Sequence, residues 1–196
     1  MILDGDWIEK IFNLWRREEY AIAKKEVSNF RMRNYDKLDR IEDKVFLDYR
    51  MAHLEYIMKN NDIANFYFKC LDDIFSDEYN RKSMEYDYYR YKWLYINNNE
   101  DILSDDFKIN QMIEIYDYYK SINNDDVALT ALENISKIKG DEDEILIHLE
   151  NLLSEKKIKE WNMIVSILND CEKISHNLYI KALDIVNKYN FNIDVI

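Results

Sequence analysis

Three histidines are the residues of this chain best suited to acid–base chemistry or metal binding, and their spacing supports neither. His53, His148 and His176 lie far apart in the sequence. None has a second ligand at the spacing of a metal-binding motif, and Glu144, four residues before His148, adds only one more group. We therefore predict surface or capping roles for the histidines, with no metal site and no cofactor.

The patterns of nucleophilic and phosphate chemistry are missing as well. No serine lies in a nucleophile turn, and two glycines, Gly5 and Gly140, are too few to build a phosphate-binding loop. Cys171 precedes His176 by five residues, which is the wrong spacing for one helix face. The chain is predicted to be non-enzymatic, with an enzyme subunit as an alternative.

Aromatic residues beside an arginine offer binding chemistry instead. The chain has 16 tyrosines, and Tyr86, Arg90 and Trp93 are spaced at i, i+4 and i+7, so that they share one face of a helix. Tyrosine gives a large contact area and a polar tip at low entropic cost, which suits a binding surface. The preceding long helix repeats this spacing. The residues predicted to bind a peptide or protein are Tyr49, His53, Tyr56, Tyr86, Arg90 and Trp93.

A second interpretation of the same aromatic segment remains open. A helix over 84–97 would be aromatic around much of its circumference, because Met84, Tyr88, Tyr91 and Tyr95 share another face. One of the two faces is core. Both faces are core if the helix packs on two sides.

The elements that position these residues are predicted to be helices throughout. With no proline and two glycines in 196 residues, the chain lacks the residues with which sheet proteins make turns and bulges. Apolar residues recur with the helical period between Asn-rich breaks such as 60–62, 97–99 and 123–126. We predict an all-α fold of about ten antiparallel helices, stacked as helical hairpins in one domain over 1–196, or else an irregular helical bundle.

A recurring pattern of small and large residues carries a resemblance. Tyr20, Ala23, Val27 and Phe30 repeat as Asn61, Ala64, Phe68 and Leu71, and again as Asp125, Ala128, Leu132 and Ile135. The pattern resembles the second helix of tetratricopeptide repeats, in which a small residue lets the paired helices approach closely. Residues 6–140 therefore resemble a degenerate tetratricopeptide-like array, which implies a superhelix of helix pairs.

Arrays of this composition are similar to the peptide-receptor regions of the Rap and arbitrium-receptor families of quorum-sensing regulators. DNA-binding members carry an N-terminal helix-turn-helix, whereas the first helices here follow the repeat pattern. Rap-type phosphatases need a glutamine on an N-terminal helix, and the only glutamine of this chain is Gln111. The resemblance implies a scaffold and a mode of ligand binding, without the output activity of either family.

Charge and hydropathy limit the partners further. The net charge of −12 arises entirely after residue 60, so that this part of the chain would repel a phosphate backbone, and nucleic acid is not an expected partner. No segment has the apolar length of a membrane span, and no secretion signal begins the chain. We predict a cytoplasmic protein whose partner is a protein or peptide, and a homodimer is compatible with the sequence.

Two functions follow from these observations. The first is a regulatory, peptide- or protein-binding module from a low-GC bacterium or its phage or mobile element, since abundant Asn, Ile, Lys and Tyr with scarce Ala, Gly, Pro and Arg is the composition that an AT-rich genome encodes. The alternative is a small acidic phage-encoded inhibitor, whose acidic second half covers a basic surface of a host defence or nucleic-acid-binding enzyme.

Overall fold

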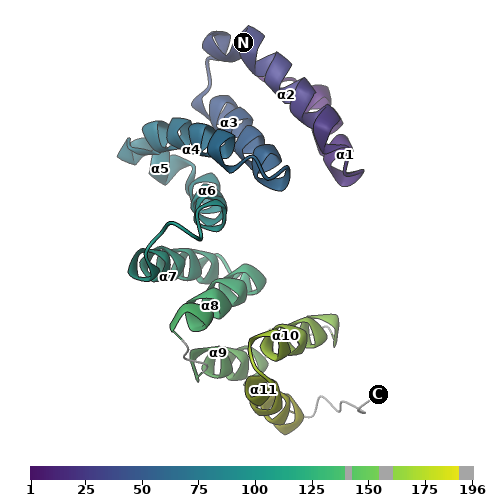
Figure 1. The fold of residues 1–196 in the computed structure, drawn as a ribbon, viewed down its shortest axis with the longest axis vertical. Coiled ribbons are helices and arrows are strands. Elements are labelled where there is room, and N and C mark those ends of the chain that lie inside the picture. Colours follow the sequence, from purple (N-terminus) through teal and green to yellow (C-terminus); the bar gives the residue numbers. More distant parts are fainter. Residues whose placement is uncertain (140–142, 155–160, 190–196) are drawn as a thin grey trace. The chain divides into compact units, whose positions relative to one another are not determined.

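The computed structural model describes residues 1–139, 143–154 and 161–189, and confirms the all-α prediction (Figure 1). These residues form eleven α-helices and one short 3-10 helix, and no strand occurs among them. The elements are α1 (Gly5–Arg16), α2 (Tyr20–Asn34), η1 (Tyr35–Lys37), α3 (Ile41–Ile57), α4 (Asn61–Phe75), α5 (Glu78–Ser83), α6 (Glu85–Asn98), α7 (Asp105–Ser121), α8 (Asp125–Lys139), α9 (Asp143–Ser154), α10 (Trp161–Ile174) and α11 (His176–Lys188).

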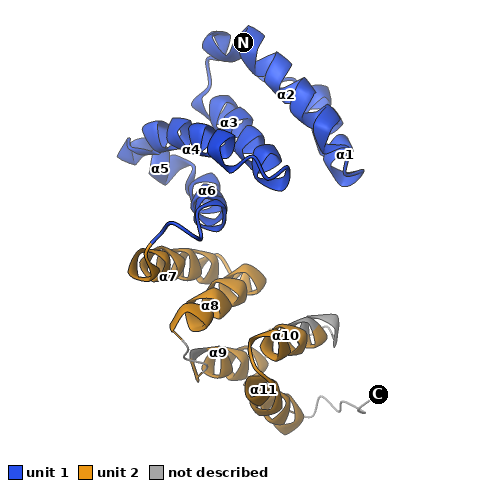
Figure 2. Ribbon diagram, in the orientation of Figure 1, with its two compact units in different colours: residues 1–103 blue, residues 104–196 orange. Residues whose placement is uncertain are grey.

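The helices group into two compact units (Figure 2). Unit 1 spans residues 1–103 and contains α1 to α6, whereas unit 2 spans residues 104–196 and contains α7 to α11. The single repeat domain over 1–196 and its tetratricopeptide-like superhelix stay predictions.

Three of the helix pairs are joined by the same turn. Glu18, Lys59 and Asn123 have left-handed backbones, with φ of 59°, 62° and 58°. Each stands two residues after one helix ends and two residues before the next begins. The amide of the following residue donates to a carbonyl five positions back, at 2.9–3.0 Å, which is the arrangement of a Schellman helix end. The pairs α1–α2, α3–α4 and α7–α8 are therefore structurally equivalent hairpins.

The alanines of the sequence pattern occupy one position in these hairpins. Ala23, Ala64 and Ala128 each follow the left-handed residue by five positions, and each is 0% exposed. Beside the turn, the two helices of a pair have just begun to diverge, so a small side chain leaves room for the partner helix. The pattern that suggested a repeat thus marks the buried start of each second helix.

Helix α3 is the central helix of the unit 1 core. On one side Leu47, Met51 and Leu54 pack with residues of α1 and α2. On the other side Val45, Tyr49 and Ala52 pack with residues of α4 and α6. Because both sides are covered, α3 buries charged residues as well as apolar ones. The buried charged residues are Asp43, Asp48, Arg50 and Glu55.

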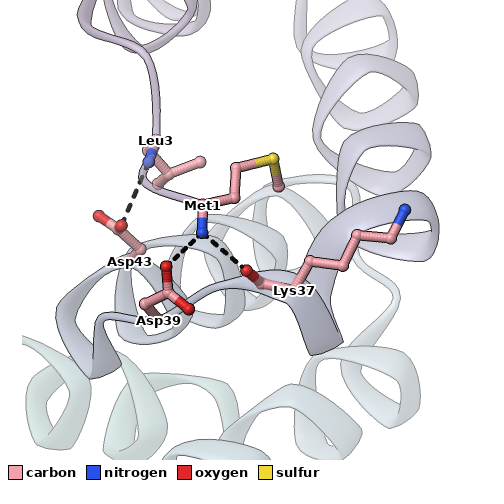
Figure 3. Close-up of polar contacts among 5 residues, drawn as sticks. All are labelled: Met1, Leu3, Lys37, Asp39 and Asp43. Carbon is pink, nitrogen blue, oxygen red and sulfur yellow. Dashed lines mark hydrogen bonds and ion pairs between the residues drawn. The ribbon is translucent and has the colours of Figure 1, made fainter.

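The N-terminal segment is attached to the start of α3 (Figure 3). The backbone amide of Leu3 donates to a carboxylate oxygen of the buried Asp43 at 3.2 Å. The amino group of Met1 donates to the carbonyl of Lys37 at 3.0 Å and contacts the carboxylate of Asp39. These contacts fix the start of α1 relative to α3.

Helix α6 packs one of its two aromatic faces into the core of unit 1. Met84 and Tyr91 are buried, and Tyr88 and Tyr95 pack against the same cluster. The helix also continues through Asn98 instead of breaking at 97–99, because Asn98 and Asn99 donate side-chain hydrogen bonds to Asn65 of α4 at 3.1 and 2.9 Å.

Candidate functional site

The six predicted binding residues all lie on two neighbouring helices of unit 1. Tyr49, His53 and Tyr56 are on α3, and the other three are on α6. The two helices contact each other directly. The structure brings four of the six residues together and leaves Tyr56 and Trp93 outside the resulting group.

Arg90 joins the two helices. Its guanidinium carbon lies 4.6 Å from the ring centre of Tyr49 and 5.3 Å from that of Tyr86, within the range of a cation–π contact. Asp87, one turn earlier on α6, places a carboxylate oxygen 3.7 Å from the guanidinium. Tyr86 is 50% exposed, whereas Tyr49 is 9% exposed, so Arg90 lies between an exposed ring and a buried one.

His53 extends the group toward α1. Its ring centre lies 5.7 Å from that of Tyr49 and 4.4 Å from that of Trp15. Its Nδ1 atom is buried and has no hydrogen-bond partner. Burial, with a smaller contribution from the positive charges of Arg50 and Arg90, lowers the pKa of His53 to about 4. The imidazole is therefore neutral at pH 7.

Tyr56 and Trp93 have different surroundings. Tyr56 packs against the core cluster of α3, α4 and α6, with the ammonium of Lys59 5.7 Å from its ring centre. Trp93 is half-buried on α6, and among the described residues no ring or charge contact links it to Arg90 or His53. Their role in binding stays a prediction.

The structure adds an arginine that the sequence analysis missed. Arg50 of α3 is 5% exposed, and its guanidinium carbon lies over three rings. The distances to the ring centres are 4.7 Å for Phe12, 5.1 Å for Trp15 and 5.4 Å for Phe46. The first two rings belong to α1, so Arg50 joins α1 to α3 as Arg90 joins α3 to α6.

A sequence signal for this arginine exists. Phe46, Arg50 and His53 repeat the i, i+4, i+7 spacing that selected Tyr49, His53 and Tyr56. We call the whole group the arginine–aromatic cluster. It consists of Phe12, Trp15, Phe46, Tyr49, Arg50, His53, Tyr86, Asp87 and Arg90.

Burial and like charge dominate the electrostatics of the cluster. Burial lowers the pKa of Arg50 to about 10, and the neighbouring positive charge of Arg90 contributes. Burial raises the pKa of Tyr49, against the opposing effect of Arg90. It also raises the pKa of Asp87, although Arg90 and Arg50 both favour the charged carboxylate. The cluster thus holds two guanidinium groups with one neighbouring carboxylate.

A different buried charge network lies between α2 and α3. Arg31 Nε donates to the Asp48 carboxylate at 2.7 Å, and the Tyr35 hydroxyl also donates to this carboxylate. Asp48 is fully buried, and its pKa is raised by burial, although both partners favour the charged form. Cys70 Sγ lies 3.8 Å from Arg31 Nη2. Both oxygens of the Asp48 carboxylate therefore accept a hydrogen bond from a neighbouring side chain.

Unit 2 contains a cavity of about 350 Å³ between α7, α8 and α9. The Tyr116 hydroxyl lies 3.1 Å from Nδ1 of the buried His148, and Lys120 Nζ donates to the same hydroxyl at 2.9 Å. The volume of this cavity is at the lower end of the range for ligand sites. Three of the polar residues that line the cavity, Tyr116, Lys120 and His148, are bonded to one another, so we regard the cavity as the weaker candidate.

Neither a metal site nor a membrane span is found in the described part of the chain. No three potential metal ligands gather there. None of its helices combines the length and the apolar character needed to cross a bilayer.

Comparison with protein-family models, with curated proteins and with solved structures gives no match to this chain. The resemblance to tetratricopeptide arrays and to Rap or arbitrium receptors therefore stays a prediction. So do the regulatory role, the phage or low-GC origin and the cytoplasmic location.

Proposed function

We propose that this protein is a non-enzymatic module that binds a peptide or a segment of a protein through the arginine–aromatic cluster. One observation carries the proposal: rings from α1, α3 and α6 surround two arginines, and part of this group remains exposed. Arg50 links α1 to α3 and Arg90 links α3 to α6, so a ligand bound at this cluster would contact more than one helix.

The residue types fit such a surface. Tyrosine, tryptophan and arginine contribute most of the energy at protein interfaces, because they combine a large apolar area with directed polar groups. Phe12 and Tyr86 are 37% and 50% exposed, and Arg90 keeps 30% of its side chain exposed. These three residues lie on α1 and α6. Their exposed area is available to a partner.

The test is capture with matched variants. The tagged full chain and its Tyr86→Ala variant are incubated with lysate of the source organism, and the bound proteins and peptides are identified by mass spectrometry. Because Tyr86 is half-exposed, its truncation should leave the melting temperature nearly unchanged and reduce recovery of the partner at least tenfold.

The control is Tyr79→Ala. Tyr79 is 79% exposed on α5 and lies outside the cluster, so its removal should leave capture intact. Recovery of the same partner by parent and Tyr86→Ala in equal amounts contradicts the proposal. A loss that Tyr79→Ala shares equally also contradicts it, since the effect would then be one of general surface composition.

A further inference from the structure

Arg50 is a buried cation with no carboxylate at ion-pairing distance among the described residues. The residue is 5% exposed, and its Nε–H is buried without a hydrogen-bond acceptor. Within residues 1–139, 143–154 and 161–189, no carboxylate comes within 4 Å of it, and Asp87 acts on it only from a greater distance. A buried guanidinium in this condition is costly, because an unpaired charge loses its hydration without replacement.

Other partly buried cations of unit 1 are treated differently. Lys24 binds the buried Glu55 at 2.8 Å, and Arg31 binds the buried Asp48 at 2.7 Å. The fold can therefore place a carboxylate beside a cation where one is needed. At Arg50 it places three aromatic rings and a second cation, Arg90, whose positive charge repels that of Arg50.

We propose that Arg50, together with Arg90, is the anchor for a carboxylate group of the bound peptide. This inference rests on the proposed function and specifies the chemistry that the surface recognises. The planar guanidinium of Arg50 can donate two parallel hydrogen bonds to a carboxylate, and because its unsatisfied Nε–H is buried, the partly exposed Phe12 ring beside it must turn aside when the carboxylate enters. The rings that hold Arg50 in place then contact the apolar part of the peptide residue that carries this carboxylate.

The charge of the cluster favours a carboxylate over a phosphate. Arg50 and Arg90 carry two positive charges and Asp87 one negative charge, while His53 is neutral, so that a single negative charge completes the balance. A phosphate dianion would exceed this balance and would meet the Asp87 carboxylate, which lies 3.7 Å from Arg90. An apolar ring wall also suits the carbon stem of a carboxylic acid better than a phosphoryl group.

The test uses sodium acetate as the probe and the side-chain Nε–Hε signals of arginine in nitrogen–proton NMR spectra of the full chain. Ionic strength is held constant with sodium chloride. We expect acetate to move the Arg50 signal downfield in a saturable manner, because its Nε–H gains an acceptor. The signal of Arg31, which already donates to Asp48, should stay in place.

The variants identify the site. In Arg50→Met the acetate response of Arg90 should fall at least tenfold in apparent affinity, because the shared anion has lost one of its two partners. The melting temperature should not fall, since methionine fills the space between the rings without an unpaired charge. Arg33→Met, a substitution at an exposed arginine of α2, should leave the response unchanged. Arg50→Lys keeps the charge without the planar donor pair and should also lose the response.

Several outcomes would overturn the inference. These are a shift that does not saturate, an equal response to chloride, a stronger response to inorganic phosphate, or a response that Arg50→Met and Arg50→Lys both retain. Failure of the acetate response while Tyr86→Ala still abolishes capture would remove the carboxylate anchor and leave the binding surface standing. A saturable response with capture unaffected by Tyr86→Ala would support the anchor and contradict the proposed function.

Discussion

Helix α3 buries a charged residue on each of two sides, and only one of the two forms an ion pair among the described residues. Toward α2, the buried Asp48 accepts from Arg31 and from Tyr35. Toward α1 and α6, the buried Arg50 is held by rings and has no carboxylate within ion-pairing distance among the described residues. The two residues are two positions apart, so the same helix shows both arrangements.

The difference separates a structural charge from a charge prepared for a ligand. A structural ion pair is satisfied within the chain, and breaking it costs stability because one buried charge remains. An unsatisfied charge costs stability in the free protein, and its cost is recovered when a ligand binds. Arg31 should therefore stabilise the free protein and Arg50 should destabilise it, and substitutions at the two positions can measure the difference.

The largest effect is expected on the complete side. Arg31→Met should lower the free energy of unfolding by about 3 kcal/mol, because the fully buried Asp48 then lacks its cationic partner. Urea unfolding followed by circular dichroism measures this change. The double variant Arg31→Met with Asp48→Asn should recover part of the loss. A loss below about 0.5 kcal/mol would show that the network contributes little, and the comparison with Arg50 would fail.

A smaller effect is expected from the pH dependence of His53 on the incomplete side. The pKa is lowered from 6.5 to about 4 in the folded chain, so the neutral imidazole stabilises the fold fully above pH 6.5. This contribution is lost as the pH falls from 6.5 to about 4. Because His53 is only half-buried, solvent screens its charge, and the pKa shift changes the free energy of unfolding by about 1–2 kcal/mol.

Urea unfolding at pH 7 and pH 4.5 provides the measurement. His53→Gln should lose about 1–2 kcal/mol less than the parent over this interval, because glutamine does not titrate. His176→Gln, at an exposed histidine of α11, provides the control and should behave as the parent. Equal pH dependence in the parent and in His53→Gln would mean that His53 remains accessible to protons in the folded chain.

The smallest effect on stability is expected at Arg90. Arg90→Lys should change the free energy of unfolding by less than about 0.5 kcal/mol, because 30% of the side chain is exposed and lysine keeps the charge. Binding of the captured partner should nevertheless weaken several-fold, since lysine lacks the planar donor pair. Titration calorimetry measures the affinity. A variant that binds as tightly as the parent would limit the anchor to Arg50.

The sequence predicted local features of the molecule well. Absence of proline and scarcity of glycine predict helices because the turns and bulges of sheet proteins need those residues. The alanine pattern located the second helix of three hairpins because the close approach of two helices beside a turn is set within a few residues. The short helix α5, between the predicted helices on either side of it, was not anticipated.

The site could be predicted only in part. Spacing placed Tyr49 with His53 and Tyr86 with Arg90, because residues three or four apart share a face of any helix. The same rule could not separate Trp93 from the group, since which face meets a neighbouring helix depends on how the helices pack. Tyr49 illustrates this limit: it lies in the core, and its ring nevertheless supports Arg90.

What the sequence by itself determined is therefore the helices, their hairpin turns and the presence of arginines beside aromatic residues, all of which depend on contacts between near neighbours in the chain. Only the tertiary structure decided that Arg31 meets Asp48 and that Arg50 meets rings of α1 and no carboxylate. The pairing of a buried charge is a property of the surrounding helices, because the partner that satisfies it, or fails to, comes from a distant part of the sequence.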